Sequence, residues 1–591
     1  MPRRTRNAPR ITACIVPLLV ILAGSSATAE PEPDFPAAAI RAHMDFLADD
    51  LLEGRAAGTP GYDIAAAYVA SVFQTLGLEP AGDADGDSRS WFQTYQLIES
   101  QLVPGSAEVT VTRDDGSESL TFETDFMARG DYLREQSEVT AGTTFVGFGV
   151  TAPELGHDDY AGVDVRGRIV AMFGGAPASF PADQRAFYSS GRVKMENAVA
   201  RGAIGVISFY TDEFLARYPW ETVVKSYAFP GMRWVAADGT VQATWPEIEG
   251  GVLLSPGGLE RLLAGSGRTG AELQAEAAEG TPRAFELPGT VTLARSSTHR
   301  RLEDRNVAAI LPGADPALRD EYVVITGHLD HIGVGPEVDG DTIYNGYYDN
   351  AAGIAIILET ARALARSAER PARSILFLAV GAEEKGLLGS DYFAANPTVP
   401  IDALVANVNF DMPLFIFPTA DVVAYGAEHS SLAAPTARAA AAAGFELSPD
   451  PMPEEVIFIR SDQFSLVRRG VPAVYLMPGM RSSDPAIDGA AAFRDFLTGR
   501  YHKPGDQSGL PFDDDTASRF TAMNYHLIRL IADAPERPTW NDGDFFGDWF
   551  GRPVDLYSDL CYWCWSAAKS GPTAGRFSLG RRNHTEGDGS R

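Results

Sequence analysis

Three features are scarce in this chain of 591 residues, and each scarcity excludes a class of protein. Only 3 cysteines occur, too few for a fold held by disulfides or for a zinc ribbon with two cysteine pairs. Basic residues are outnumbered, 49 lysines and arginines against 79 acids, so the formal net charge is -30. Nucleic-acid binding needs a basic surface, so we expect no nucleic-acid partner.

Long hydrophobic runs are the third scarcity, and the longest one stands at the N-terminus. Four arginines and no acid occupy the first ten residues, an apolar run of about 14 residues follows, and small residues lead up to Ala29. A membrane span needs about 20 apolar residues. The layout therefore predicts a signal peptide over residues 1–29, with an uncleaved anchor as the alternative, and a secreted or periplasmic protein without a stable membrane span.

The composition, 45% hydrophobic and 22% charged, is that of a globular protein, and the length predicts two or more domains. Near the C-terminus, Cys561 and Cys564 form a CYWC segment that is either two free thiols or a local disulfide. Changes of texture along the chain predict these divisions: signal peptide 1–29, helices and then polar-aromatic strands 30–137, a β-rich segment with one short helix 138–290, alternating strands and helices 291–535, and an aromatic, then disordered tail 536–591.

The alternation of strands and helices after residue 305 predicts an α/β fold with a mixed, mainly parallel sheet flanked by helices. Ligands of such sheets bind at the carboxyl ends of the strands. In this chain those ends carry imidazoles and carboxylates, namely His328, Asp330, Asp349, Glu383, Glu384, Asp411 and His502. Each alone has a plainer explanation, such as a helix cap for Asp349.

Together, however, these acids follow apolar runs that must be buried, and burying several carboxylates without a cation is very unfavourable. Nitrogen and carboxylate ligands without thiolate suit zinc, with cobalt or manganese as substitutes. A second acidic group, His157-Asp158-Asp159, is better explained as a turn than as a metal site.

Six ordered motifs resemble the co-catalytic zinc aminopeptidases of peptidase family M28: TGHLDHIG, NGYYDNAAGIA, GAEEKGLLGS, NFDM, SDQFSLVRRGVPAVYL and YHKPGDQ. The resemblance implies two zinc ions, peptide substrates and the ligands His328, Asp349 (bridging), Glu384, Asp411 and His502. It also implies Glu383 as general base, Asp330 as the carboxylate that orients His328, and Tyr501 as support for the tetrahedral intermediate. Residues 138–290 resemble a protease-associated domain, a module inserted into many peptidases.

Two departures from the family pattern are visible. Tyr348 precedes the bridging Asp349 where the family usually has an acid or Asn, and Gln463 ends the Ser461-Asp462-Gln463 segment where His is common. The first departure leaves the local support of the metals open, and the second leaves the role of the third position open.

Other activities remain as alternatives. A carboxypeptidase of the glutamate type would need cations for the substrate carboxylate, with Arg460, Arg468 and Arg469 as candidates. The five-ligand set argues against a single-zinc glutaminyl cyclase and against a receptor-like protein that has lost its metal ligands. The sequence leaves open the preferred N-terminal residue of the substrate, the roles of the insertion and the aromatic tail, and the oligomeric state.

Overall fold

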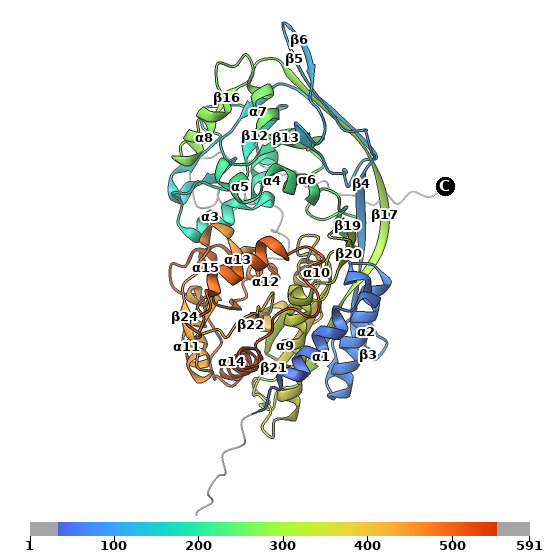
Figure 1. Ribbon diagram of the computed structural model, residues 1–591, viewed down its shortest axis with the longest axis vertical. Helices are drawn as coiled ribbons and strands as arrows, with labels where there is room; N and C mark the ends of the chain where they lie inside the picture. The colour runs from blue at the N-terminus through green and yellow to red at the C-terminus, as the bar shows by residue number, and fades with distance from the viewer. Residues whose placement is uncertain (1–32, 552–591) are drawn as a thin grey trace, which may run out of the picture.

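The computed structural model describes residues 33–551 (Figure 1). The predicted signal peptide, the last part of the tail and the pair Cys561 and Cys564 lie outside the described residues. Within residues 33–551, no helix has the length and apolar character needed to cross a membrane.

The larger of two main sheets has the order β14-β4-β17-β21-β18-β22-β25-β23-β24, and its centre is parallel from β21 to β25. This confirms the mixed, mainly parallel sheet that the sequence predicts for the second half of the chain. The strands are β14 (Gly231–Val235), β4 (Phe92–Leu102), β17 (Thr290–Leu311), β21 (Ser374–Val380), β18 (Tyr322–His328), β22 (Leu404–Asn409), β25 (Ala473–Pro478), β23 (Asp421–Tyr425) and β24 (Glu446–Ser448).

Helices cover both faces of this sheet, and the central strands are apolar on both faces for that reason. On β18, Val323 and Ile325 pack into one hydrophobic cluster, while Val324 packs into another on the opposite face. The first face is covered by α1 (Ala37–Leu47), α2 (Pro60–Thr75), α9 (Ala352–Arg366) and α14 (Asp514–Ala532). The second is covered by α10 (Leu388–Ala395) and α12 (Gln463–Val467).

Helix α2 shows how local sequence sets these boundaries. Thr59 caps its N-terminus by accepting a hydrogen bond from the Tyr62 backbone N–H, and Pro60 occupies the first helical position. Gly77, with a φ of 76°, follows its last turn. Helix α2 is one of the helices that the sequence predicts at the start of residues 30–137.

A second sheet, in the order β16-β9-β12-β13-β15-β7, lies in the upper half of Figure 1. Its strands are β16 (Phe285–Glu286), β9 (Thr143–Phe145), β12 (Ile169–Phe173), β13 (Gly205–Phe209), β15 (Gly250–Leu254) and β7 (Phe126–Met127). The sequence predicted one short helix here, now α4 (Gly191–Ala200). The structure adds α3 (Ala182–Ser189), α5 (Asp212–Arg217), α6 (Trp220–Ser226), α7 (Pro256–Leu263) and α8 (Gly270–Ala278).

The additional helices are short, and local capping explains two of them. Ser255 accepts a hydrogen bond from Gly258 N–H at the start of α7, and Thr269 and Glu272 form a capping box at the start of α8. These capping residues are few and local, so the helices they begin are not visible in the spacing of apolar residues.

The same region contains the His157 turn. Asp159 accepts hydrogen bonds from the backbone N–H groups of Phe148 and Val150, and its other oxygen lies 2.9 Å from His157 Nε2. The carboxylate therefore organises a turn, as the sequence predicted.

Strand β17 joins the two halves of the molecule, and β4 runs beside it along the right edge in Figure 1. Its first residues pair with β5 (Glu108–Arg113) and β8 (Gln136–Ala141), and its last residues pair with β21. The helix α15 (Phe545–Phe550) adds a second connection, because Phe545 contacts Phe187 of α3 while Phe546 contacts Phe458 near α12. The first part of the aromatic tail therefore packs on both halves of the molecule.

Candidate metal centre

Three neighbouring parallel strands end at the same place, and each end supplies candidate ligands. His328 is the last residue of β18, Glu383 and Glu384 follow β21, and Asp411 follows β22. The loop after α13 (Gly489–Gly499) brings His502 to the same place. Asp349 comes from a turn, η3 (Tyr347–Ala351), that leads into α9. The structure thus brings together all of the ligands that the sequence predicts.

Asp349 is shared between two groups of these side chains. Its Oδ1 lies 3.2 Å from His328 Nε2, which is also 3.1 Å from Asp411 Oδ1. Its Oδ2 lies 3.2 Å from His502 Nε2, which is also 3.1 Å from Glu384 Oε2. One carboxylate therefore stands between two imidazole–carboxylate pairs, the arrangement expected of a bridging ligand.

His331 was missed by the reasoning from sequence. Its Nδ1 lies 2.7 Å from Glu384 Oε1 and 3.8 Å from Asp349 Oδ2, and its ring is fully buried. Potential ligand atoms of His331, Asp349 and Glu384 lie within 4.8 Å of one another. The signal was present in the sequence, because His331 directly follows Asp330 in TGHLDHIG.

The adjacent glutamates differ in their surroundings. Burial raises the pKa of Glu383 well above the ordinary glutamate value, and the charges of Glu384 and Asp411 raise it further. For Glu384, burial acts in the same direction, but the imidazoles of His502 and His331 outweigh it and hold its pKa well below the usual range. Glu383 is therefore suited to taking up a proton and Glu384 to remaining an anionic ligand.

The carboxylate of Asp330 holds this glutamate pair in place. It accepts hydrogen bonds from Glu383 N–H at 3.0 Å and from Glu384 N–H at 3.3 Å. Its Oδ1 is 3.9 Å from His328 Nδ1, which instead lies 3.1 Å from the backbone carbonyl of Asp330. The imidazole is thus oriented by the main chain of Asp330, while the side chain orients the two glutamates.

Asp506 supports the turn that carries Asp349. Its carboxylate accepts hydrogen bonds from the backbone N–H groups of Tyr348 and Asp349, at 3.0 and 3.1 Å. Asn350 fastens the same turn to the strand ends by donating to the carbonyl oxygens of His328 and Phe410. The Asp349 turn is therefore held by Asp506 and not by the side chain at position 348. The buried Tyr348 instead donates a hydrogen bond from its hydroxyl to Pro511 O.

The segment from Ser461 to Gln463 contacts the site through its first residue. Ser461 donates a hydrogen bond of 2.7 Å to Asp411 Oδ2 and so orients a candidate ligand. Gln463 is buried and donates to Phe458 O, so its side chain serves the local fold. The ring of Tyr501 stacks on His502 with centroids 3.8 Å apart.

The residues present fit a pair of divalent cations. His328, Asp349 and Asp411 are mostly or fully buried, and burying so many charged groups requires a compensating charge. Both ring nitrogens of His331 and Oε1 of Glu384 are buried without a hydrogen bond, although the two side chains lie 2.7 Å apart. Buried nitrogen and oxygen atoms seldom lack a hydrogen bond, and coordination to a metal ion explains why several of them converge here.

A mixed α/β domain with such a cluster at its strand ends has the design of a metalloenzyme. Residues 306–528 match the model of peptidase family M28, and this span contains every residue of the cluster. The chain therefore carries a metallopeptidase domain of family M28, and the resemblance seen in the motifs is confirmed.

Individual relatives are more distant. Leupeptin-inactivating enzyme 1 of Streptomyces exfoliatus is 31% identical over 129 residues, 22% of this chain and 27% of that protein. An aminopeptidase of Pseudomonas aeruginosa is 27% identical over 366 residues, 61% of this chain and 53% of that protein. The chain thus spans about a quarter of the first relative and about half of the second. Among solved structures, an aminopeptidase from Aneurinibacillus sp. strain AM-1 is 20% identical with a TM-score of 0.49, covering 85% of this chain and 95% of its own.

Proposed function

We propose that the protein is a zinc-dependent aminopeptidase that removes N-terminal residues from peptides at a dinuclear centre. The observation that carries the proposal is the position of Asp349 between the His328–Asp411 and His502–Glu384 pairs. One ion would be held by the first pair and the other by the second, with Asp349 shared. His331 lies on the side of the second ion and contacts its ligand Glu384.

Zinc ions in this place would polarise the scissile carbonyl and lower the pKa of a bound water to about 7. The protein's own part is proton transfer, and Glu383 is the residue suited to it because its pKa is raised by burial. In this role Glu383 takes a proton from the attacking water and returns it to the departing amine. Asp330 keeps the glutamate in position through the backbone N–H of residue 383.

The role assignment is tested by Glu383→Gln and Glu384→Gln, measured for zinc content and for hydrolysis of aminoacyl chromogenic substrates. Glu383→Gln should retain zinc and lose about 10²- to 10⁴-fold in kcat, the usual contribution of a general base. Glu384→Gln should lose zinc as well as activity. Equal zinc loss in the two variants would contradict the division of roles.

A glutamate-type carboxypeptidase would act on N-acylated peptides and would need a free arginine near the metals. Arg468 donates to Asp391 Oδ1 at 3.1 Å and is committed to that carboxylate. Arg460, about half exposed, lies 3.1 Å from Glu455 Oε2. The ion pair of Arg468 disfavours a carboxypeptidase, whereas Arg460 also interacts electrostatically with Tyr501 and Glu383. The substrate panel should therefore include N-acetylated controls, whose preferential cleavage would reverse the assignment.

We also propose that the protein is exported after cleavage at Ala29, and that the segment 138–290 is a protease-associated insertion. The charge and apolar pattern of residues 1–29 supports export. Expression of the full chain in a bacterial host, followed by fractionation and N-terminal sequencing, tests it. A cytoplasmic product that retains residue 1 would contradict it.

A further inference from the structure

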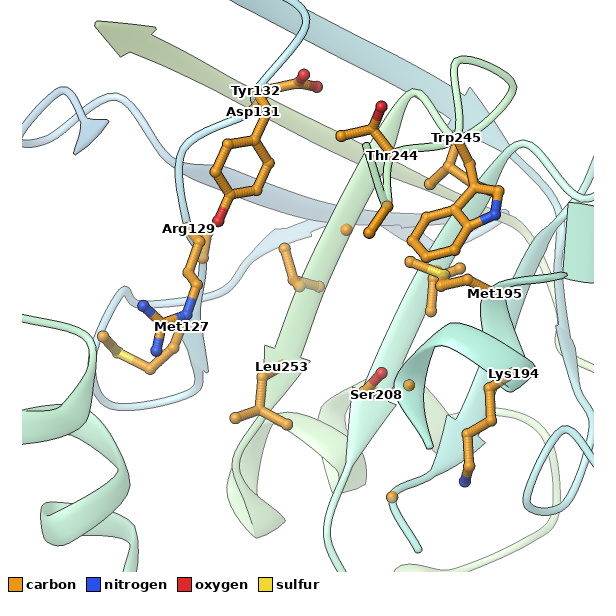
Figure 2. A pocket seen from close by; sticks show the side chains of 18 of the residues that line it. Met127, Arg129, Asp131, Tyr132, Lys194, Met195, Ser208, Thr244, Trp245 and Leu253 are labelled. Atoms are coloured by element: carbon orange, nitrogen blue, oxygen red, sulfur yellow. The ribbon is translucent and has the colours of Figure 1, made fainter. Parts of the chain in front are cut away.

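A second candidate site lies in the other half of the molecule, away from the metal ligands. A cavity of about 500 Å³ opens between the second sheet and β14, the edge strand of the large sheet. Figure 2 shows Tyr132 and Arg129 on one side of it, Trp245 and Met195 on the other, and Leu253 and Ser208 between them. None of the candidate metal ligands lines this cavity.

The charges around the cavity run against those of the whole protein. Among the described residues that line it, only Asp131 is acidic, while five are basic: Arg129, Arg134, Lys194, Arg233 and Arg295. The chain as a whole has a net charge of -30. A concentration of positive charge in a concave site of an acidic protein attracts anions and keeps them there.

Asp131 accounts for only two of the five cations. Its Oδ2 lies 3.2 Å from Arg295 and 3.7 Å from Arg134. The Nε atom of Arg295 is buried and makes no hydrogen bond. One carboxylate thus faces two guanidinium groups, one of which retains an unused donor.

Among the described residues, the other three basic side chains donate their hydrogen bonds to neutral carbonyl groups. Arg129 donates to the carbonyls of Ser226 and Phe229, and its guanidinium lies over Tyr227 at 4.2 Å from the ring centroid. Arg233 donates to the carbonyls of Met232 and Ala243, and lies 4.6 Å from the Tyr132 centroid.

Lys194 is buried, and its Nζ donates to Phe173 O at 2.8 Å. For Arg129, Arg233 and Lys194, no carboxylate lies within ion-pair distance in the part of the chain that the structure describes. For the two arginines, carbonyl groups satisfy hydrogen bonds but leave the positive charge uncompensated.

Apolar and aromatic side chains make up most of the remaining wall, with Ser189, Ser208 and Thr244 as polar members. Trp245, Tyr132, Met195 and Leu253 face the space that Figure 2 shows. Tyr132 is fixed closely, since a Cβ at Gly231 would meet its hydroxyl oxygen at 2.0 Å. Rigid aromatic side chains of this kind hold flat or apolar groups at a low entropic cost.

We propose that this cavity binds a small ligand in which a carboxylate is joined to an apolar or aromatic body, such as an amino acid or short peptide with a free C-terminal carboxylate. The carboxylate would meet Arg129 and Arg233, and the body would lie between Tyr132 and Trp245. Arginine suits this task because its planar guanidinium can bind a carboxylate through two hydrogen bonds. The proposal does not depend on the reaction at the metal centre.

The test is calorimetric titration of the full-length, metal-loaded protein with N-acetyl-phenylalanine and with its amide. The blocked amine keeps both compounds from being aminopeptidase substrates. The acid should bind at least about tenfold more tightly than the amide, because the amide lacks the charged hydrogen-bond acceptor. Acetate alone should bind more weakly than N-acetyl-phenylalanine. Equal affinity for acid and amide, or no binding of either at millimolar concentration, would overturn the proposal.

Variants locate the binding. Arg129→Gln and Arg233→Gln should each weaken binding of the acid about tenfold and leave the amide unaffected. Arg129 is exposed, so its replacement should leave the fold intact. Arg166→Gln, at a 79% exposed arginine that pairs with Asp164 in the same region, is the matched control. Full binding in both cavity variants, with loss only after chelation of the metal, would assign the carboxylate to the metal centre and reject the cavity.

Discussion

The two halves of the molecule are each built on a sheet whose central strands are parallel, yet they gather opposite charges. At the ends of β18, β21 and β22, carboxylates and imidazoles converge and form a site suited to cations. Around the second sheet, arginines converge and form a site suited to an anion. The difference teaches that the fold provides a concave edge, while a few side chains at that edge decide which charge of ligand is bound.

The largest expected effect is at Asp349, the proposed bridging ligand of the metal centre. Asp349→Ala should remove a ligand from both cations, whereas Asp411→Ala should remove one from a single cation. We expect Asp349→Ala to lose both zinc ions and about 10³-fold or more in kcat/KM. Elemental analysis should find about one zinc ion per chain in Asp411→Ala, with Asp164→Ala as the surface control. Two zinc ions retained in Asp349→Ala would show that the carboxylate is not a bridge.

A smaller effect is expected at His331. Because it contacts Glu384 and Asp349 without a hydrogen bond, His331→Asn should weaken zinc at that position about 10- to 100-fold. Competition with a chromogenic chelator measures this affinity directly. His157→Asn replaces a histidine of the other half that serves a turn, and it should leave zinc affinity unchanged. The same affinity in wild type and His331→Asn would mean that His331 only fills space.

The smallest expected effect is on folding stability, whose dependence on pH should reflect the buried Lys194 beside the second sheet. Burial lowers the pKa of Lys194 to about 7, against 10.5 for the free side chain. Between pH 7 and about 10.5 the unfolded chain therefore binds a proton that the folded protein releases, so folding stability rises with pH in this window.

Lys194→Met should remove about 2 kcal/mol of the stability gained between pH 7 and pH 9, measured by urea unfolding at both values. Lys225→Met, at an exposed lysine of α6, is the control and should retain the gain. A stability gain in Lys194→Met equal to that of the wild type would show that Lys194 keeps its proton when folded.

The metal half could be predicted from the sequence because its geometry is local to strand ends. His328, Glu384 and Asp411 follow apolar runs, and parallel pairing of β18, β21 and β22 places these strand ends together. Asp349 opens a helix and His502 lies in the loop after α13, so the motif resemblance, and not the strand pattern, predicted these two. What the sequence did not reveal was which carboxylates position the ligand-bearing segments. That Asp330 holds the glutamates, and that Asp506 holds the Asp349 turn, depends on backbone N–H directions that no residue pattern encodes.

The cationic cavity could not be predicted for a different reason. Its arginines lie at positions 129, 134, 233 and 295, and each looks like an ordinary surface residue in its own segment. They meet only because β14 pairs with β4 and β17 pairs with β4 and β8, contacts that span more than a hundred positions. No spacing rule connects such residues, so the surplus of charge becomes visible only in three dimensions.

The 22-residue strand β17 has a consequence for how the two halves can be separated. At about 3.3 Å per residue, β17 is about 70 Å long when measured along the chain, and it is hydrogen-bonded to partner strands from both halves. Deleting residues 138–290 would remove β14, the partner of β4, and most of β8, a partner of β17. The unpaired strand edges that remain would favour aggregation. The two halves therefore share a continuous strand and its hydrogen bonds, so the upper half cannot be removed as an independent module without disrupting the large sheet.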